Sequence, residues 1–167
     1  MPKDTLWNAA NEGRIDDVKK FLNDGTFDIH ATNSDGWTAL HEACKNGHCD
    51  IAELLLEIEG RSTSGDDATP LMYACCWYHL SVIQLLLDRK CVMDATDVDG
   101  CTALHYACCG FHSSTACVKE LLDHGADIHF PDFEGETPMD HANEPEMCTR
   151  LPTTIIILFL MVINYFY

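Results

Sequence analysis

The chain has 167 residues, the usual size of one domain, and its 47% of apolar residues is enough for a hydrophobic core rather than a disordered chain. It contains 27 Asp and Glu residues against 10 Lys and Arg, which gives a formal net charge of −17. Such an acidic surface repels phosphate groups, so nucleic-acid binding is not expected, and a partner with a Lys/Arg-rich surface is favoured.

The ten cysteines follow an N-terminus, MPKDTLWNAANEGR, that lacks the apolar segment of a signal peptide. They fall within apolar helical patterns, and Cys75–Cys76 and Cys108–Cys109 are adjacent pairs. A free cysteine behaves as a small buried hydrophobic residue. We therefore expect a reducing compartment, no structural disulfides and a cytoplasmic location, with the nucleus and a membrane-anchored form as alternatives.

One phrase occurs four times along the chain. In its full form, at 97–109, it consists of an Asp-x-x-Gly turn, a threonine suited to capping a helix, and a short apolar helix; the copy at 67–76 lacks the turn. The copies are DGWTALHEAC at 35–44, DATPLMYACC at 67–76, DVDGCTALHYACC at 97–109 and EGETPMDHAN at 134–143. The threonines Thr38, Thr69, Thr102 and Thr137 lie 31, 33 and 35 residues apart, a mean of 33. This period predicts a stack of similar helical units.

The period, the turn and the T-P-L-H-x-A phrase resemble the ankyrin-repeat family over about residues 4–144. The resemblance implies an all-α solenoid of helix–turn–helix units joined by β-hairpin-like loops. We expect an ankyrin-repeat domain at 1–150, with units at about 4–32, 33–66, 67–98 and 99–131 and a partial unit at 132–150. The second helices are expected at about 15–23, 49–58, 80–89 and 117–124.

Three departures from the family pattern carry structural predictions. The polar loop 59–68 is two residues short. This predicts a shorter or irregular finger, the hairpin-like loop that precedes the capping threonine, before Thr69. Met72 replaces the usual histidine. Tyr78 replaces the usual glycine that ends the first helix, and because a left-handed non-glycine residue costs about 1 kcal/mol or more, we expect that turn to be remodelled.

The end of the chain departs most from the family pattern. Pro145 and Pro152 interrupt the place of the last second helix, and the uncharged, apolar segment 151–167 follows. Three interpretations stay open for this tail. It is a short membrane anchor, it folds back over the end of the stack, or it is not part of the natural fold.

A comb of Cys and His side chains resembles a zinc site at first sight. His105, Cys108, Cys109 and His112 lie at offsets suited to one helix face. The resemblance implies a scaffold role instead, with the histidine bonded to the capping threonine and Cys108 in a small-residue position. The chain also lacks familiar catalytic motifs. We therefore expect no enzyme activity, no cofactor and no metal.

In the family, fingertips and first helices line a concave binding groove. Trp37 and Trp77 are large apolar groups where the scaffold does not need them, and tryptophan is frequent at binding hot spots. We expect a monomeric interaction module or adaptor that binds a protein or peptide of basic character; the alternative is the same domain tethered to a membrane by 151–167. The expected partner-binding residues are Ser34, Asp35, Trp37, Lys45, Asn46, Asp66, Asp67, Cys76, Trp77, Val98, Asp99, Cys101, Cys109, Phe133, Glu134 and Glu136.

Overall fold

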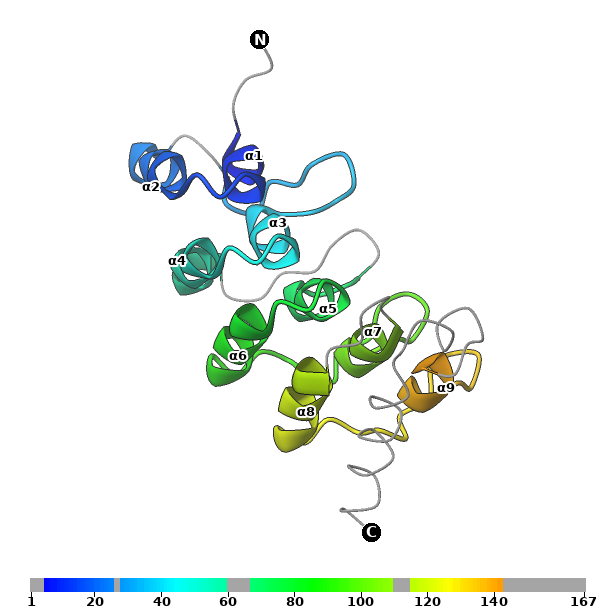
Figure 1. The fold of residues 1–167 in the computed structure, drawn as a ribbon. Coiled ribbons are helices and arrows are strands. Elements are labelled where there is room, and N and C mark those ends of the chain that lie inside the picture. Colours follow the sequence, from blue (N-terminus) through cyan, green and yellow to red (C-terminus); the bar gives the residue numbers. More distant parts are fainter. Residues whose placement is uncertain (1–4, 26–27, 60–66, 110–114, 143–167) are drawn as a thin grey trace.

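The computed structural model describes residues 5–25, 28–59, 67–109 and 115–142, and within these ranges the regular secondary structure is entirely helical (Figure 1). The all-α class is therefore confirmed. The tail 151–167 and most of the loop 59–68 lie outside the described residues. The helices are α1 (Leu6–Asn11), α2 (Ile15–Asp24), α3 (Ala39–Lys45), α4 (Cys49–Glu59), α5 (Pro70–Cys76), α6 (Leu80–Asp88), α7 (Ala103–Cys109), α8 (Thr115–Asp123) and α9 (Pro138–Ala142).

The helices form two layers that follow the order of the chain. The first helices α1, α3, α5, α7 and α9 pack successively on one another, and α2, α4, α6 and α8 form the second layer beside them (Figure 1). The loops before α3, α7 and α9 project away from the second layer. This arrangement is the solenoid expected from the repeated phrase.

The core repeats from unit to unit because the same positions are apolar in each. Leucines at one position of α3, α5 and α7 are almost completely buried, and a fully buried leucine stabilises the fold by about 2 kcal/mol. An alanine and a cysteine on the same face are small enough to let neighbouring helices approach. The three sets are Leu40, Leu71 and Leu104; Ala43, Ala74 and Ala107; and Cys44, Cys75 and Cys108.

The nine cysteines in the described ranges are all free thiols. Burial raises the pKa of the Cys75 thiol well above its usual value and that of the Cys108 thiol to about 12. Both thiols therefore stay protonated at neutral pH and act as packing groups. The predicted role of Cys108 as a small buried residue is confirmed.

Threonine begins the first helices, as the sequence predicts. The Thr69 hydroxyl accepts the Met72 backbone N–H at 3.3 Å, and Pro70 fills the first helical position, where an N–H would have no partner. In α1, Thr5 accepts the Asn8 N–H, also at 3.3 Å. These caps fix where each first helix leaves its finger.

The turn after α5 corrects one prediction. Tyr78 adopts a left-handed φ of 58°, and the His79 N–H donates to the Ala74 carbonyl at 3.0 Å. After α3, Gly47 has φ 75° and the corresponding bond from His48 to Ala43 is 2.9 Å. The turn is therefore kept, and the expected remodelling is wrong, because the same backbone hydrogen bond forms in both units.

The predicted second helices are present, with small differences at their ends. The largest concerns α8, which begins at Thr115, two residues before the expected start, and ends at Asp123. Gly25 follows α2 in the left-handed conformation, with φ 60°.

Among the described helices, none is both long enough and apolar enough to cross a bilayer.

Candidate interaction surface

The loops before α3, α7 and α9 share one hydrogen-bonded turn, and we call the segments 33–38, 97–102 and 132–137 the second, fourth and last fingers. In the last finger, Asp132 Oδ1 accepts the backbone N–H groups of Glu134 and Glu136, both at 2.9 Å. Asn33 and Asp97 make the same pair of bonds with their Oδ1 atoms. One side-chain oxygen thus holds each finger in shape.

The second polar atom of the same residue reaches the helix that follows, nine residues later. Asn33 Nδ2 donates to Glu42 Oε1 at 2.9 Å in the second finger. The Tyr106 hydroxyl donates to Asp97 Oδ2 at 2.6 Å in the fourth. In the last finger, Asp132 Oδ2 lies 2.8 Å from His141 Nε2. We call these contacts struts, because each ties a finger to its own first helix.

Buried histidines join each finger base to the next unit. His105 Nδ1 accepts the Thr102 backbone N–H at 3.0 Å, and its Nε2 donates to the Glu136 carbonyl at 3.2 Å. His41 repeats this with Thr38 and with the Ala68 carbonyl. Burial lowers the pKa of His105, which agrees with a neutral ring that accepts at one nitrogen and donates at the other.

Met72 occupies the position at which the second and fourth units have His41 and His105. Its sulfur accepts the Thr69 backbone N–H at 3.2 Å, so the bond to the finger base survives. A thioether cannot donate a hydrogen bond, so the link to the next unit is lost.

The fourth and last fingers carry exposed apolar side chains. Phe133 is 77% exposed and Val98 is 54% exposed. The two fingers are joined by a hydrogen bond from the Phe133 N–H to the Asp99 carbonyl at 3.0 Å. The Phe133 ring also lies against Gly100, where an added Cβ would come within 2.7 Å of it. Neighbouring fingers therefore present an apolar surface next to carboxylates.

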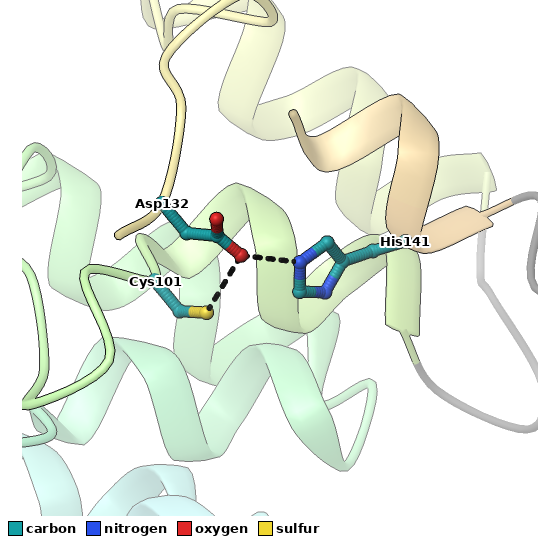
Figure 2. A group of neighbouring side chains, drawn as sticks. All are labelled: Cys101, Asp132 and His141. Atoms are coloured by element: carbon teal, nitrogen blue, oxygen red, sulfur yellow. Dashed lines mark hydrogen bonds and ion pairs between the residues drawn. The ribbon is translucent and has the colours of Figure 1, made fainter. Parts of the chain in front are cut away.

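Between these two fingers lies a cluster of three metal-ligating side chains, Cys101, Asp132 and His141, shown in Figure 2. Cys101 Sγ lies 4.0 Å from Asp132 Oδ2, and Asp132 Oδ2 lies 2.8 Å from His141 Nε2. On the other side of the imidazole, Cys109 Sγ is 3.3 Å from His141 Nδ1. The cluster draws on two fingers and α9.

The surroundings shift the pKa of the carboxylate and the pKa of the thiol in this cluster in opposite directions. Burial alone would raise the pKa of the Asp132 carboxyl, but hydrogen bonds from His141 and from the Glu136 and Glu134 backbone lower it overall. Burial, followed by the charges of Asp97 and Asp132, raises the pKa of the Cys101 thiol to about 12. At neutral pH the cluster therefore holds a carboxylate beside a protonated thiol.

A sequence profile of the family described as ankyrin repeats (3 copies) matches residues 6–97 and 79–151 of the chain. These two segments cover most of its length. The chain belongs to the ankyrin-repeat family. Ankyrin repeats are in general non-catalytic protein–protein interaction modules, which agrees in broad terms with the function expected from the sequence.

Segments of much longer proteins are similar to this chain. Tyrosine-protein kinase HTK16 of Hydra vulgaris is 32% identical over 143 residues, which cover 83% of this chain and 19% of the kinase. The mitochondrial disaggregase of Bos taurus is 31% identical over 160 residues, or 89% of this chain and 22% of the disaggregase. Cortactin-binding protein 2 of Mus musculus is 39% identical over 61 residues, which cover 36% of this chain and 4% of that protein. The chain spans about a fifth of the length of the first two relatives.

Most of the predicted partner-binding residues lie on the surface of the ankyrin stack. Asp66 lies outside the described residues. Exposed members are Ser34, Asp35, Asn46, Asp67, Trp77, Val98, Asp99, Cys109, Phe133 and Glu134, and half-buried members are Trp37, Lys45, Cys76, Cys101 and Glu136.

The two tryptophans differ in their surroundings. The ring centroid of Trp37 lies 4.9 Å from that of Tyr73 in the next ankyrin unit, and Lys45 Nζ lies 4.0 Å above the Trp37 ring. The expectation that the scaffold does not need Trp37 is therefore wrong, because this ring packs between units. Trp77, at the end of α5, is 54% exposed.

The predicted roles of the cysteine–histidine comb are confirmed for His105 and Cys108, which are buried in the ankyrin scaffold. Cys109 contacts His141, and Cys101 contacts Asp132, so both of these expected partner-binding residues also have contacts within the stack. His112 lies outside the described residues. The Cys101, Asp132 and His141 cluster escaped sequence reasoning, and its only sequence signal is the nine-residue spacing of the strut.

Proposed function

We propose that this ankyrin domain is a protein-binding module that holds a basic peptide with an apolar anchor against its fourth and last fingers. The observation that carries the proposal is the exposure of Val98 and Phe133 on neighbouring fingers, with Trp77 exposed on the preceding unit. Exposed large apolar groups set among polar residues mark interaction sites. Aromatic side chains are also the most frequent anchors of binding energy.

The charge pattern favours a basic partner. The second, fourth and last fingers contain several carboxylates and no lysine or arginine. Asp99 and Glu134 are exposed next to the apolar pair Val98 and Phe133. A peptide with Lys or Arg on both sides of a Phe or Leu would place cations on these carboxylates and its apolar residue between the fingertips.

A direct test measures binding of labelled peptides with a central Phe or Leu flanked by Lys and Arg. Phe133→Ser should lower the affinity for the tightest-binding peptide about 30-fold. This loss corresponds to about 2 kcal/mol of binding free energy, which is typical of a hot spot. Val98→Ser should weaken it less, because valine offers less area. The matched control is Val92→Ser, at an exposed valine in the loop after α6, outside the finger segments. Equal losses in Val92→Ser and Phe133→Ser would contradict the proposed site.

Charge reversal tests the basic character separately. Glu134→Lys should slow association and weaken binding, and added salt should reduce the difference from the wild type, because surface charges act at long range and are screened. Asp88→Lys, at an exposed residue that ends α6, makes the same change of net charge outside the fingers. A peptide affinity that does not depend on salt would argue against a basic partner.

We also propose a cytoplasmic location for the domain, supported by the free thiols of the described cysteines, which suit a reducing compartment. The alternative is tethering by the apolar segment 151–167. Fractionation of cells that express the chain with and without 151–167 separates the two. If both forms are found in the soluble fraction, the tether is excluded. If the full chain is found in the membrane fraction and the truncated chain is not, the cytoplasmic proposal is wrong.

A further inference from the structure

We propose that Cys101, Asp132 and His141 bind a zinc ion between the fourth and last fingers. One ligand atom from each lies within 4.8 Å of the others, and all three side chains are at least half-buried. Thiolate, imidazole and carboxylate are the three donor types that bind zinc in proteins. The site goes beyond the proposed peptide surface and does not depend on it.

Asp132 has an oxygen to spare for a metal. Its Oδ1 atom accepts the two backbone N–H groups that shape the last finger. Its Oδ2 atom points toward Cys101 Sγ and His141 Nε2, as Figure 2 shows. The finger therefore fixes the carboxylate and leaves one lone-pair side directed at the other two donors. Such second-shell hydrogen bonds orient a metal ligand.

The distances fit a zinc ion after small side-chain movements. Zinc bonds of about 2.3 Å to sulfur and 2.0 Å to oxygen or nitrogen place tetrahedral S···O and N···O pairs about 3.5 and 3.3 Å apart. The present distances are 4.0 Å for Cys101 Sγ to Asp132 Oδ2 and 2.8 Å for His141 Nε2 to the same oxygen. Each of these two distances needs to change by about 0.5 Å. The ligand atoms of Cys101 and His141 lie within 4.8 Å of each other and need to come to about 3.5 Å, and rotation of the side chains supplies these changes.

A fourth zinc ligand and a hydrogen-bond partner for the His141 ring are also present near the cluster. Glu136 Oε2 lies 3.7 Å from His141 Nε2, so Glu136 or a water molecule completes four-fold coordination. When Nε2 binds zinc, the imidazole proton lies on Nδ1. The Nδ1–H group then donates a hydrogen bond to Cys109 Sγ, which lies 3.3 Å away. Binding to the neutral imidazole releases one proton, from the Cys101 thiol, because the imidazole only moves its proton from Nε2 to Nδ1.

The strut of the finger does not by itself explain the cluster. In the fourth finger the strut pairs Asp97 with the phenol of Tyr106, and in the second finger Asn33 with Glu42. The position of Cys101 is taken by Trp37 in the second finger and by Ala68 before α5. In the described part of the chain, a thiol, a carboxylate and an imidazole converge at this one place.

The repeats themselves supply variants that keep the fold. His141→Tyr rebuilds the strut seen between Asp97 and Tyr106 and deletes the nitrogen ligand. Cys101→Ala places at that position the residue found at Ala68. The matched control, Cys76→Ser, removes a half-buried thiol at the position in α5 that corresponds to Cys109. Retained helical circular dichroism would establish that each variant folds.

The experiment titrates the metal-free full-length chain with Co²⁺ and then displaces Co²⁺ with Zn²⁺. The wild type and Cys76→Ser should bind one equivalent, with a thiolate-to-cobalt charge-transfer band and four-coordinate visible bands. Cys101→Ala and His141→Tyr should lose more than about 100-fold in affinity, beyond the effect of a second-shell change, and Cys109→Ser should lose about tenfold. Wild-type binding by Cys101→Ala or His141→Tyr would overturn the site, as would a wild type without a stoichiometric band.

Thermal unfolding gives an independent measurement. With free Zn²⁺ at about a hundred times its dissociation constant, the wild-type midpoint should rise by roughly 5–10 °C, because zinc binds the folded chain. Cys101→Ala and His141→Tyr should show no such rise. Peptide binding by His141→Tyr tests the proposed function on its own, since His141 is not one of the expected partner-binding residues and Val98 and Phe133 are unchanged. A zinc-dependent rise of the same size in Cys101→Ala would overturn the inference.

Discussion

The second and last fingers have the same backbone and different chemistry. Both are shaped by one Oδ1 atom that accepts two backbone N–H groups. The remaining polar atom makes a strut from an amide to a buried carboxylate in the second finger and from a carboxylate to an imidazole in the last. The comparison shows that the turn requires only one acceptor oxygen, so the strut partner is free to vary.

The two fingers also differ in how they are held at the base. His41 accepts from Thr38 and donates to the Ala68 carbonyl of the next unit. In the last unit, Asp140 accepts from the Thr137 N–H and hydroxyl, at 2.8 and 2.7 Å. A carboxylate has no proton to donate, so this cap closes its own helix without reaching beyond it.

The largest expected effect comes from breaking the link between units. His41→Ala removes the hydrogen bonds of the ring to the buried Thr38 N–H and to the Ala68 carbonyl, which should lower the free energy of unfolding by about 3 kcal/mol in urea titrations. His41→Met should cost about half as much, because Met72 shows that sulfur still accepts the threonine N–H. Asp140→Ala, on an exposed side chain, should cost less than either. Equal losses at His41 and Asp140 would show that the link between units adds nothing.

A smaller effect should come from two glycines at the same position of neighbouring fingers. Gly100 and Gly135 have φ of 85° and 87°, so alanine strains both by about 1 kcal/mol. At Gly100 the new Cβ would also come within 2.8 Å of the Phe133 backbone nitrogen, whereas at Gly135 no described atom lies within 4 Å. Gly100→Ala should therefore lower the free energy of unfolding by about 2 kcal/mol or more in total.

The control for this pair is internal, since both variants remove a left-handed glycine. If Gly100→Ala and Gly135→Ala have the same urea midpoint and slope, the fourth and last fingers are not held in contact in solution. A larger loss for Gly100→Ala would support the stacking of Phe133 on Gly100 that the proposed binding surface needs.

The sequence predicted the features that depend on neighbouring residues. The helix pairs, the capping threonines, the buried Cys108 and the role of His105 all follow from local propensity and from the repeat period. The exposure of Val98 and Phe133 also follows, because the tip of a tight turn points to solvent.

The features that the sequence did not predict depend on how units stack. Trp37 meets Tyr73, and Cys101 meets Asp132, only when neighbouring units are brought together across more than thirty residues. The way in which neighbouring units stack decides such contacts, and no local sequence pattern indicates it. The turn at Tyr78 differs from these contacts, because it is decided within one unit. The hydrogen bond from His79 to Ala74 holds the turn against a conformational penalty that local preference alone would not overcome.

The smallest expected effect concerns the carboxylate of the second strut. Burial raises the pKa of Glu42 above 4.5, although Lys45 and the Asn33 amide oppose this, and Glu42 Oε2 has no hydrogen-bond partner among the described residues. Since the folded pKa lies above that of the unfolded chain, the stabilising contribution is fully present below pH 4.5 and is lost as the pH rises through the folded pKa.

Glu42→Gln removes this titration and keeps an oxygen that can accept from Asn33. The wild type should therefore lose stability relative to Glu42→Gln as the pH rises from 4 to 8, by less than about 1 kcal/mol, measured by urea unfolding at each pH. Glu134→Gln, on an exposed fingertip, shows how much of the trend comes from removing any one carboxylate. If the Glu42→Gln difference stays flat with pH, or runs the other way, the carboxylate of the second strut is not penalised by burial. The second and last struts would then differ only in their polar groups and in the direction of the hydrogen bond, because the finger residue donates in the second strut and accepts in the last.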